Sequence, residues 1–377
     1  MLGSSIKLYD LIVRSASEGL KIQNTAGEYP SGHNGPWNDA DTNVRTTAHW
    51  ALITFKAYEI TGEEKFLSSA IMACDYLIRK EVRPYGYTFY CRTYQKGRNM
   101  CNGLIGQAWA MEPLIFIGAS LNNPEYLRVV RNVVLMHKYS RKYHAWNNTE
   151  INGTTLGINN TLNQQVWFAA LSLTAGKILR DKELNDSAED FFINLPLLGS
   201  YIEEKGLIRH EFNVHSCTFR STVKKLISGK IKRAMHHDKI NLLSQGYLSF
   251  VLYGLALVYE RNSEEHFWND DRLKIFISDA IDYIIDNLPF GWGEKTGYRW
   301  CYNPTGIEMA YVLQVFQKYL NSESFSDLIS LFLNKQFEFY YDFEKNVLSK
   351  NTMDPAILSA RLYEAVRLKN YNICMPN

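Results

Sequence analysis

The chain has 377 residues, of which 46% are hydrophobic and 21% charged, and its 41 basic and 39 acidic residues give a formal net charge of +2. This composition excludes a disordered chain, a collagen and a small disulfide-bonded scaffold. The balanced charge also argues against a nucleic-acid-binding protein, which usually carries a basic excess. Aromatic residues make up 14% of the chain, and such an excess in loops indicates surfaces on which sugars, bases or peptides stack.

Cysteines and the N-terminal segment bear on cofactors and location. Six cysteines are scattered along the chain without a C-x-x-C pair, so we expect no metal and no cofactor. The first twenty residues lack the basic start, apolar core and cleavage site of a secretory signal, and no uninterrupted apolar run reaches the ~18 residues that span a bilayer. We therefore expect a cytoplasmic protein.

Pairs of helical patterns recur along the chain. Apolar residues recur at helical spacing over 47–60 and 65–80, and Thr61 and Gly62 form the turn between them. Four similar pairs follow, at 104–118 with 125–138, 163–180 with 185–195, 246–260 with 270–287, and 306–320 with 325–341. One unpaired helix, at about 5–20, precedes the first pair, and another, at 354–369, follows the last.

Pairing of the two unpaired helices would give six hairpins and close the chain into a ring. A linear solenoid would instead need polar capping repeats at its ends, and neither end has that character. The sequence therefore predicts an all-α (α/α)6 toroid that forms one catalytic domain over residues 1–377.

The links between hairpins are long, whereas the turns within them are short. The long links are 25–46, 83–103, 139–162, 200–245 and 289–305. Loops of this length are usually functional, and in a toroid these links emerge on one face. We expect the active site there.

The first long link leads into a helix and is rich in polar and aromatic residues. One aspartate here is explained by helix capping, but Asp39 and Asp41 together exceed that need. Arg45 and His49 are four residues apart and share one helical face. We expect the following residues of this link in the site: His33, Trp37, Asp39, Asp41, Arg45 and His49.

The stretch from Asp41 through His49 and Trp50 to the turn at 58–66 (YEITGEEKF) resembles unsaturated glucuronyl hydrolases of glycoside hydrolase families 88 and 105. Those enzymes use aspartates to protonate and hydrate the enol-ether bond of a 4,5-unsaturated uronic acid. The resemblance implies the six-hairpin fold and a proton donor at Asp41 or Asp39. A second aspartate of those families corresponds to Asn102 here. The stretches CNGLIGQAW, YNPTGIEMAY and DPAILSARLYE are also similar to uncharacterised six-hairpin proteins linked to bacterial surface-polysaccharide synthesis.

The other links supply residues suited to an acidic sugar. Tyrosines stack on pyranose rings and arginines bind carboxylates in a bidentate manner, while amides bind hydroxyl groups. From 83–107 we select Tyr90, Arg92, Asn102 and Gln107, and from the start of the next helix Gln164 and Trp167. From 247–308 we select Tyr247, Trp292, Tyr298, Tyr302 and Glu308.

The longest link, 200–245, contains His210, Glu211, His215 and Arg220, and six basic residues without an acidic one between 220 and 237. Glu211 is the best second carboxylate, and His210 is the catalytic candidate beside it. The basic run is typical of a mobile lid or of a surface for an anionic glycan or a phospholipid headgroup. We therefore expect a lid at 200–245 and peripheral membrane contact through 220–237.

Three functions are compatible with these residues. The leading hypothesis is a glycoside hydrolase-like enzyme that acts on a uronate-containing bacterial oligo- or polysaccharide, with Asp41 as general acid. The first alternative is a polysaccharide lyase or uronate epimerase, in which a histidine or tyrosine removes the proton next to the carboxylate and Asn102 or Arg92 neutralises the acid. The second alternative is a non-catalytic glycan-binding protein of a polysaccharide assembly system.

Overall fold

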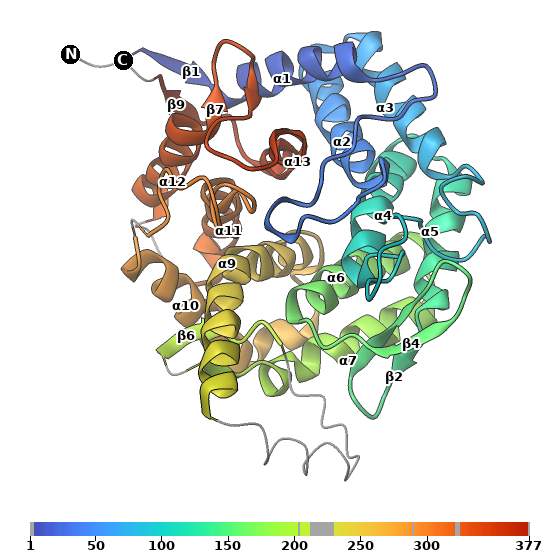
Figure 1. Cartoon of the computed structure of the whole chain (residues 1–377), viewed down its shortest axis with the longest axis vertical. Coiled ribbons are helices and arrows are strands. Elements are labelled where there is room, and N and C mark those ends of the chain that lie inside the picture. Colours follow the sequence, from blue (N-terminus) through green and yellow to red (C-terminus); the bar gives the residue numbers. More distant parts are fainter. Residues whose placement is uncertain (1–3, 203, 212–229, 289, 321–324, 376–377) are drawn as a thin grey trace.

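The computed structural model describes residues 4–202, 204–211, 230–288, 290–320 and 325–375, with the backbone alone for 230–237. In these residues six inner segments follow one another around an axis, and each packs against the next (Figure 1). They are α2 (Val44–Thr61), α4 (Gly103–Ser120), α6 (Leu162–Leu179), α9 (Lys230–Asn262), α11 (Thr305–Tyr319), and α13 (Pro355–Ala360) continued by the 3-10 helix η3 (Arg361–Arg367). The ring closes because η3 packs back on α2.

An outer layer of helices surrounds this ring. It consists of α1 (Leu8–Ile22), α3 (Glu64–Leu77), α5 (Pro124–Met136), α7 (Lys182–Leu198), α10 (Asp271–Asp286) and α12 (Phe325–Tyr340). Each of the last five follows an inner helix in the chain and packs against it, while α1 packs on α2. The predicted all-α (α/α)6 toroid is confirmed.

Burial differs between the two layers as their sequences require. In α4 every residue from Gly103 to Ile115 is buried, because an inner helix has neighbours on all sides. In α5 the buried residues form a single stripe at helical spacing: Tyr126, Val129, Val130, Val133 and Val134. The inner helix α4 is therefore buried on all its faces, whereas the outer helix α5 is amphipathic.

Short strands close the ring and brace the links. The strand β1 (Ser5–Lys7) pairs antiparallel with β9 (Asn372–Cys374), which joins the two end segments beside the contact of α1 with η3. The predicted closure is thus confirmed, with a two-stranded clasp that the sequence did not indicate. The other short elements are β2 (Tyr139–Ser140), β3 (Ala145–Thr149), β4 (Thr155–Ile158), β5 (Tyr201–Ile202), β6 (Glu204–Ile208), β7 (Tyr341–Asp342), β8 (Val347–Leu348), η1 (Gly35–Trp37) and η2 (His266–Asn269).

The predicted lid at 200–245 needs correction. Strands β5 and β6 occupy its beginning, and α9 begins at Lys230 rather than near 246, because no glycine or proline interrupts 230–245. Residues 212–229, with His215 and Arg220, lie outside the described residues, so the membrane contact predicted for 220–237 stays a prediction. The part of α9 from Asp238 to Asn262 is long and apolar enough to cross a bilayer, but 83% of its apolar window is buried in the protein.

Candidate active site

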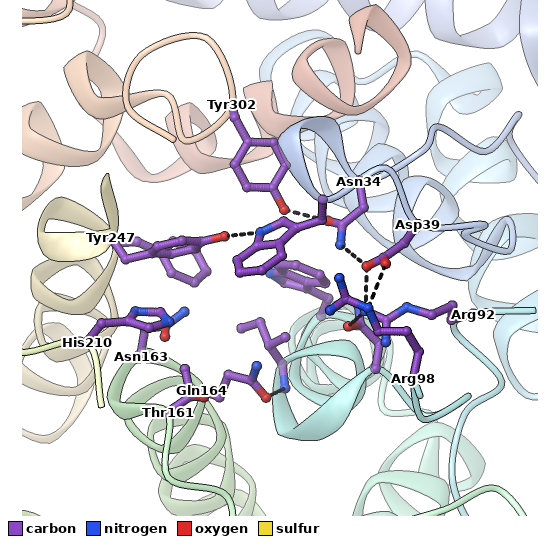
Figure 2. A pocket seen from close by; sticks show the side chains of 15 residues that line it. Asn34, Asp39, Arg92, Arg98, Thr161, Asn163, Gln164, His210, Tyr247 and Tyr302 are labelled. Carbon is purple, nitrogen blue, oxygen red and sulfur yellow. Dashed lines mark hydrogen bonds and ion pairs between the residues drawn. The ribbon is translucent and has the colours of Figure 1, made fainter. Parts of the chain in front are cut away.

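A cavity of about 200 Å³ opens where the long links meet at one end of the inner ring (Figure 2). Its walls come from the first link, the 83–102 link, the starts of α4 and α6, His210, α9 and the link before α11. The lining residues are Asn34, Trp37, Asp39, Arg92, Arg98, Asn102, Ile105, Trp109, Thr161, Asn163, Gln164, His210, Tyr247, Phe250 and Tyr302.

Main-chain hydrogen bonds fasten the first two links together. The Thr42 amide donates to the carbonyl of Cys91 at 3.0 Å, and the Thr93 amide donates to that of Ala40 at 2.8 Å. Between these bonds the backbones of residues 41 and 92 pair directly. The two links therefore form one continuous wall.

Asp354 anchors the first link to the last inner helix. Its side chain caps α13 by accepting from the amide of Ile357 at 3.2 Å. Its second oxygen accepts from the amides of His33 and Gly35 at 2.8 and 3.0 Å. One carboxylate thus joins the end of the ring to the loop that carries the cavity's acidic residue.

A charged cluster forms one wall of the cavity. The carboxylate of Asp39 is fully buried and accepts from Arg92 at 2.6 Å and from Asn34 Nδ2 at 2.8 Å. Arg98 lies 3.5 Å from the other oxygen of Asp39, and its side chain is 38% exposed. Two guanidinium groups face one carboxylate here, so this wall is positive and attracts an anion (Figure 2).

His210 forms the opposite wall. Its main chain is fixed, because the amide donates to Ser244 Oγ at 2.8 Å and the carbonyl accepts from the amide of Leu162 at 2.8 Å. Burial lowers the pKa of the imidazole to about 4, so the ring is neutral at pH 7. Its Nδ1 atom is buried and has no hydrogen-bond partner.

Tyr247 stands beside His210, with 4.9 Å between the ring centroids. Its hydroxyl accepts from the indole nitrogen of Trp37 at 2.6 Å, so the hydroxyl hydrogen remains free to be donated. Arg98 lies over the same indole ring, 5.5 Å from its centroid. Tyr247 thus contacts the indole nitrogen of Trp37, and Arg98 contacts the face of its ring.

Several other buried polar atoms of the lining residues lack partners. They are Asn163 Oδ1, Trp109 Nε1 and Arg92 Nε. Buried polar atoms are satisfied in most proteins, so unpaired atoms around one cavity indicate a ligand rich in hydrogen-bonding groups.

Asp41 lies next to this cavity, although it does not line it. The carboxyl group is buried, and neither oxygen has a partner. Burial raises its pKa to about 7, against the opposing effect of Arg45 and Arg92. Asp41 is thus protonated in part at neutral pH, unlike an ordinary surface aspartate. Among the described residues, no cluster of three or more histidines, cysteines or acidic residues could hold a metal ion.

Comparison with known proteins assigns the chain to a family. No protein-family model matches it. It is 32% identical to archaeal glycosylation protein Q of Haloferax volcanii over 97% of its own length and 98% of that protein. The chain belongs to the archaeal glycosylation protein Q family.

Several solved structures have the same fold as this chain. D-mannose isomerase superposes with a TM-score of 0.66 at 10% identity, over 95% of both chains. Cellobiose 2-epimerase from Bacillus thermoamylovorans gives 0.63 at 12% identity, over 94% of this chain and 97% of that one. A family 88 glycosyl hydrolase from Bacteroides vulgatus gives 0.59 at 11% identity, over 95% and 97%. The resemblance to six-hairpin glycosidase-like proteins is confirmed as a shared fold.

The cavity brings together residues from six separate parts of the sequence. The selected residues that line it are Trp37, Asp39, Arg92, Asn102, Gln164, His210, Tyr247 and Tyr302. The prediction that the long links share one site therefore agrees with their placement.

Other selected residues lie behind the cavity wall. The Arg45 guanidinium packs 3.9 Å from the ring centroid of Trp109. His49 is fully buried and stacks on Tyr363 at 4.0 Å, and burial lowers its pKa well below the ordinary value. Arg45 and His49 do share a helical face, but neither lines the cavity. Arg45 supports the cavity from behind by donating to Asn34 and Tyr302 at 2.6 and 3.1 Å.

Three further selected residues hold the scaffold. Gln107 exchanges hydrogen bonds with the main chain of Phe89 at 2.7 and 3.0 Å and so fixes the 83–102 link. Trp167 stacks on Phe250 at 4.6 Å. Glu308 pairs with Arg361 at 2.7 Å inside the barrel, which corrects its expected place in the site.

The remaining selected residues lie outside the cavity lining. His33 contacts the carbonyl of Met353, Tyr298 packs on Trp37, and Glu211 pairs through its main chain with Thr161. Tyr90 contributes its carbonyl to Thr42, and Trp292 packs on Trp300.

The sequence analysis did not select seven lining residues: Asn34, Arg98, Ile105, Trp109, Thr161, Asn163 and Phe250. Helical spacing is a signal for three of them. Ile105 and Trp109 are four residues apart on α4, just after Asn102, and Phe250 follows Tyr247 by three residues on α9.

Proposed function

We propose that this protein is a carbohydrate-active enzyme that removes the proton next to the carboxylate of a uronate residue, as an epimerase or a lyase does, with His210 as the base. The observation that carries this proposal is the neutral imidazole with an unpartnered nitrogen in a buried cavity. The cavity volume, about 200 Å³, suits one sugar residue. The name of the Haloferax relative supports a role in glycan chemistry.

The residues around His210 suit this reaction. The His210 imidazole would take the proton from C5 of the uronate, and the electron pair of the broken C–H bond would move toward the carboxylate. Arg98 would bind that carboxylate and Tyr247 would donate a hydrogen bond to it, so both would stabilise the developing charge. Return of a proton to the other face of C5 gives the epimer, whereas loss of the C4 substituent gives an unsaturated sugar.

The cavity gives less support to glycoside hydrolysis by a pair of carboxyl groups. Glycosidases commonly need two carboxyl groups on either side of the scissile bond. Among the described residues that line the cavity, only Asp39 is acidic, and Arg92 holds it in a buried ion pair.

A second candidate function is glycoside hydrolysis with Asp41 as general acid. The observation that favours it is the pKa of about 7 of this buried carboxyl group, because a general acid must stay protonated near neutral pH. This function requires Asp41 to reach the substrate, since its side chain does not line the cavity as it stands.

The test is incubation of the full chain with uronate-containing oligosaccharides in D2O, followed by proton NMR. We expect deuterium at C5, or the ultraviolet absorbance of an unsaturated product. His210→Gln should lower the rate at least ~100-fold, as expected for loss of a general base. The exposed His266 in η2 provides the matched control, because His266→Gln removes a histidine outside the cavity and should leave the rate unchanged.

The alternatives give different signals in the same experiment. New reducing ends without deuterium at carbon, lost in Asp41→Asn but retained in His210→Gln, would replace the proposal with hydrolysis. Saturable sugar binding without any reaction would indicate a glycan-binding protein.

A further inference from the structure

A second pocket, of about 240 Å³, adjoins the cavity. Arg92, Arg98, Asn102, Thr161 and Gln164 line both spaces, so the two are neighbours that share a wall. The second pocket continues past this wall to Asn99, Asn148, Asn159 and Asn160. We call it the amide pocket.

Three of the carboxamide oxygens in the amide pocket are already engaged. Asn99 Oδ1 accepts from the amide of Gly103 at 2.9 Å, and Asn102 Oδ1 accepts from Arg92 at 2.6 Å. Asn148 Oδ1 accepts from Asn159 Nδ2 at 2.8 Å. These bonds fix the orientation of each side-chain amide, so its NH2 group points away from the donor that its oxygen binds.

Gln164 follows the same pattern. Its Oε1 atom accepts from Asn159 Nδ2 at 2.7 Å and from the amide of Leu104 at 3.1 Å. The NH2 groups of Gln164, Asn99, Asn102 and Asn148 donate to no other described residue. Four fixed donors therefore remain for a ligand.

The charge of the amide pocket matches its donors. No described residue that lines it is acidic. Arg98 contacts Asp39 through its Nε atom at 3.5 Å, and its side chain is 38% exposed, so the guanidinium lies at the wall that both spaces share. A pocket with amide and guanidinium donors binds an acceptor-rich anionic group, because hydrogen bonds to a charged acceptor are the stronger ones.

We propose that the amide pocket is a second sugar subsite, which binds the carboxylate of the sugar next to the one in the cavity. The protein would then bind the acidic end of an oligosaccharide rather than a free monosaccharide. This inference rests on the proposed function only in that the cavity must hold a sugar. It is tested by measuring binding rather than reaction.

The experiment compares a disaccharide of two linked glucuronates with glucuronic acid by calorimetric titration of the full chain. We expect the disaccharide to bind at least ~10-fold more tightly. Asn148→Asp keeps the acceptor for Asn159 and replaces the free NH2 group with a charged oxygen. It should weaken the disaccharide at least ~10-fold and leave glucuronic acid unchanged.

Asn152→Asp is the matched control. Asn152 is exposed, its side chain accepts from the amide of Thr154, and the substitution adds the same charge outside the pocket, so disaccharide binding should not change. A carboxyl-reduced and a sulfated disaccharide complete the series. Equal affinity for the carboxyl-reduced form, preference for the sulfated form, equal affinity for one and two sugars, or no binding at all would each overturn the inference. Tight disaccharide binding without any reaction would uphold the subsite while refuting the proposed function.

Discussion

Two aspartates of the first link show how environment divides the roles of like residues. Asp39 is buried against Arg92 at 2.6 Å and lines the cavity. Asp41 is buried without a hydrogen-bond partner. The sequence placed both in the site. Their spacing does not tell which of them Arg92, 53 positions away from Asp39, would neutralise.

Asp41 makes stability depend on pH. Burial raises its pKa from 3.8 to about 7, so between these values the folded protein binds more protons than the unfolded chain. The free energy of unfolding then decreases as pH rises through this interval, by an upper limit of about 4 kcal/mol. We expect Asp41→Asn to be more stable than the native chain at pH 8 and to lose this advantage at pH 4.5, as measured by urea denaturation.

Asp39→Asn provides the contrast at the same scale. It leaves the Arg92 guanidinium buried without its counter-ion, which should cost about 3 kcal/mol at neutral pH.

For Asp41, a difference in unfolding free energy between the native and Asp41→Asn proteins that does not change with pH would show that Asp41 is ionised throughout.

At the scale of elements, the start of α4 shapes both the cavity and the amide pocket. Asn102 and Gly103 both have left-handed φ angles, 54° and 61°. A Cβ atom on Gly103 would lie 2.3 Å from Gln164 Oε1. The turn thus needs glycine both for its backbone angle and for the close approach of α6.

Gly103→Ala should therefore cost more than backbone strain alone. We expect a loss of about 2–4 kcal/mol, the sum of left-handed strain and crowding against Gln164. Gly62→Ala at the end of α2 is the control, because Gly62 has a φ of 72° but no atom within 4 Å of the added methyl group. Equal losses of unfolding free energy in the two variants would contradict the close contact.

Helices were predictable because their signals are local. The stripe of α5 and the apolar α4 are readable within a window of about fifteen residues. The cavity was predictable only in part, since its pairs are distant in sequence: Trp37 bonds Tyr247 across 210 positions, and Arg92 bonds Asp39 across 53. The sequence identified most of these residue types, while the partner of each depended on how the ring closes.

At the scale of the whole molecule, buried ion pairs inside the barrel join the last inner segment to the rest. Arg361 in η3 contacts Glu308 of α11 at 2.7 Å and Glu364 at 2.6 Å. Arg367, one turn or more further on, pairs with Glu112 of α4 at 2.7 Å. Burial raises the pKa of Glu364 well above its ordinary range, so this carboxyl group favours its protonated form beside Arg361.

The free energy of unfolding should therefore depend more on Arg361 than on the carboxyl group of Glu364. Arg361→Met should reduce the free energy of unfolding by about 3–5 kcal/mol at pH 7, because a buried carboxylate loses its counter-ion. The loss should shrink at pH 5, where the carboxyl groups of the variant take up protons. Glu364→Gln replaces a protonated acid by a neutral amide of the same shape and should cost less than about 1 kcal/mol. Denaturation at both pH values measures these differences, and an equal cost for the two substitutions would show that Glu364 is ionised and that Arg361 balances it.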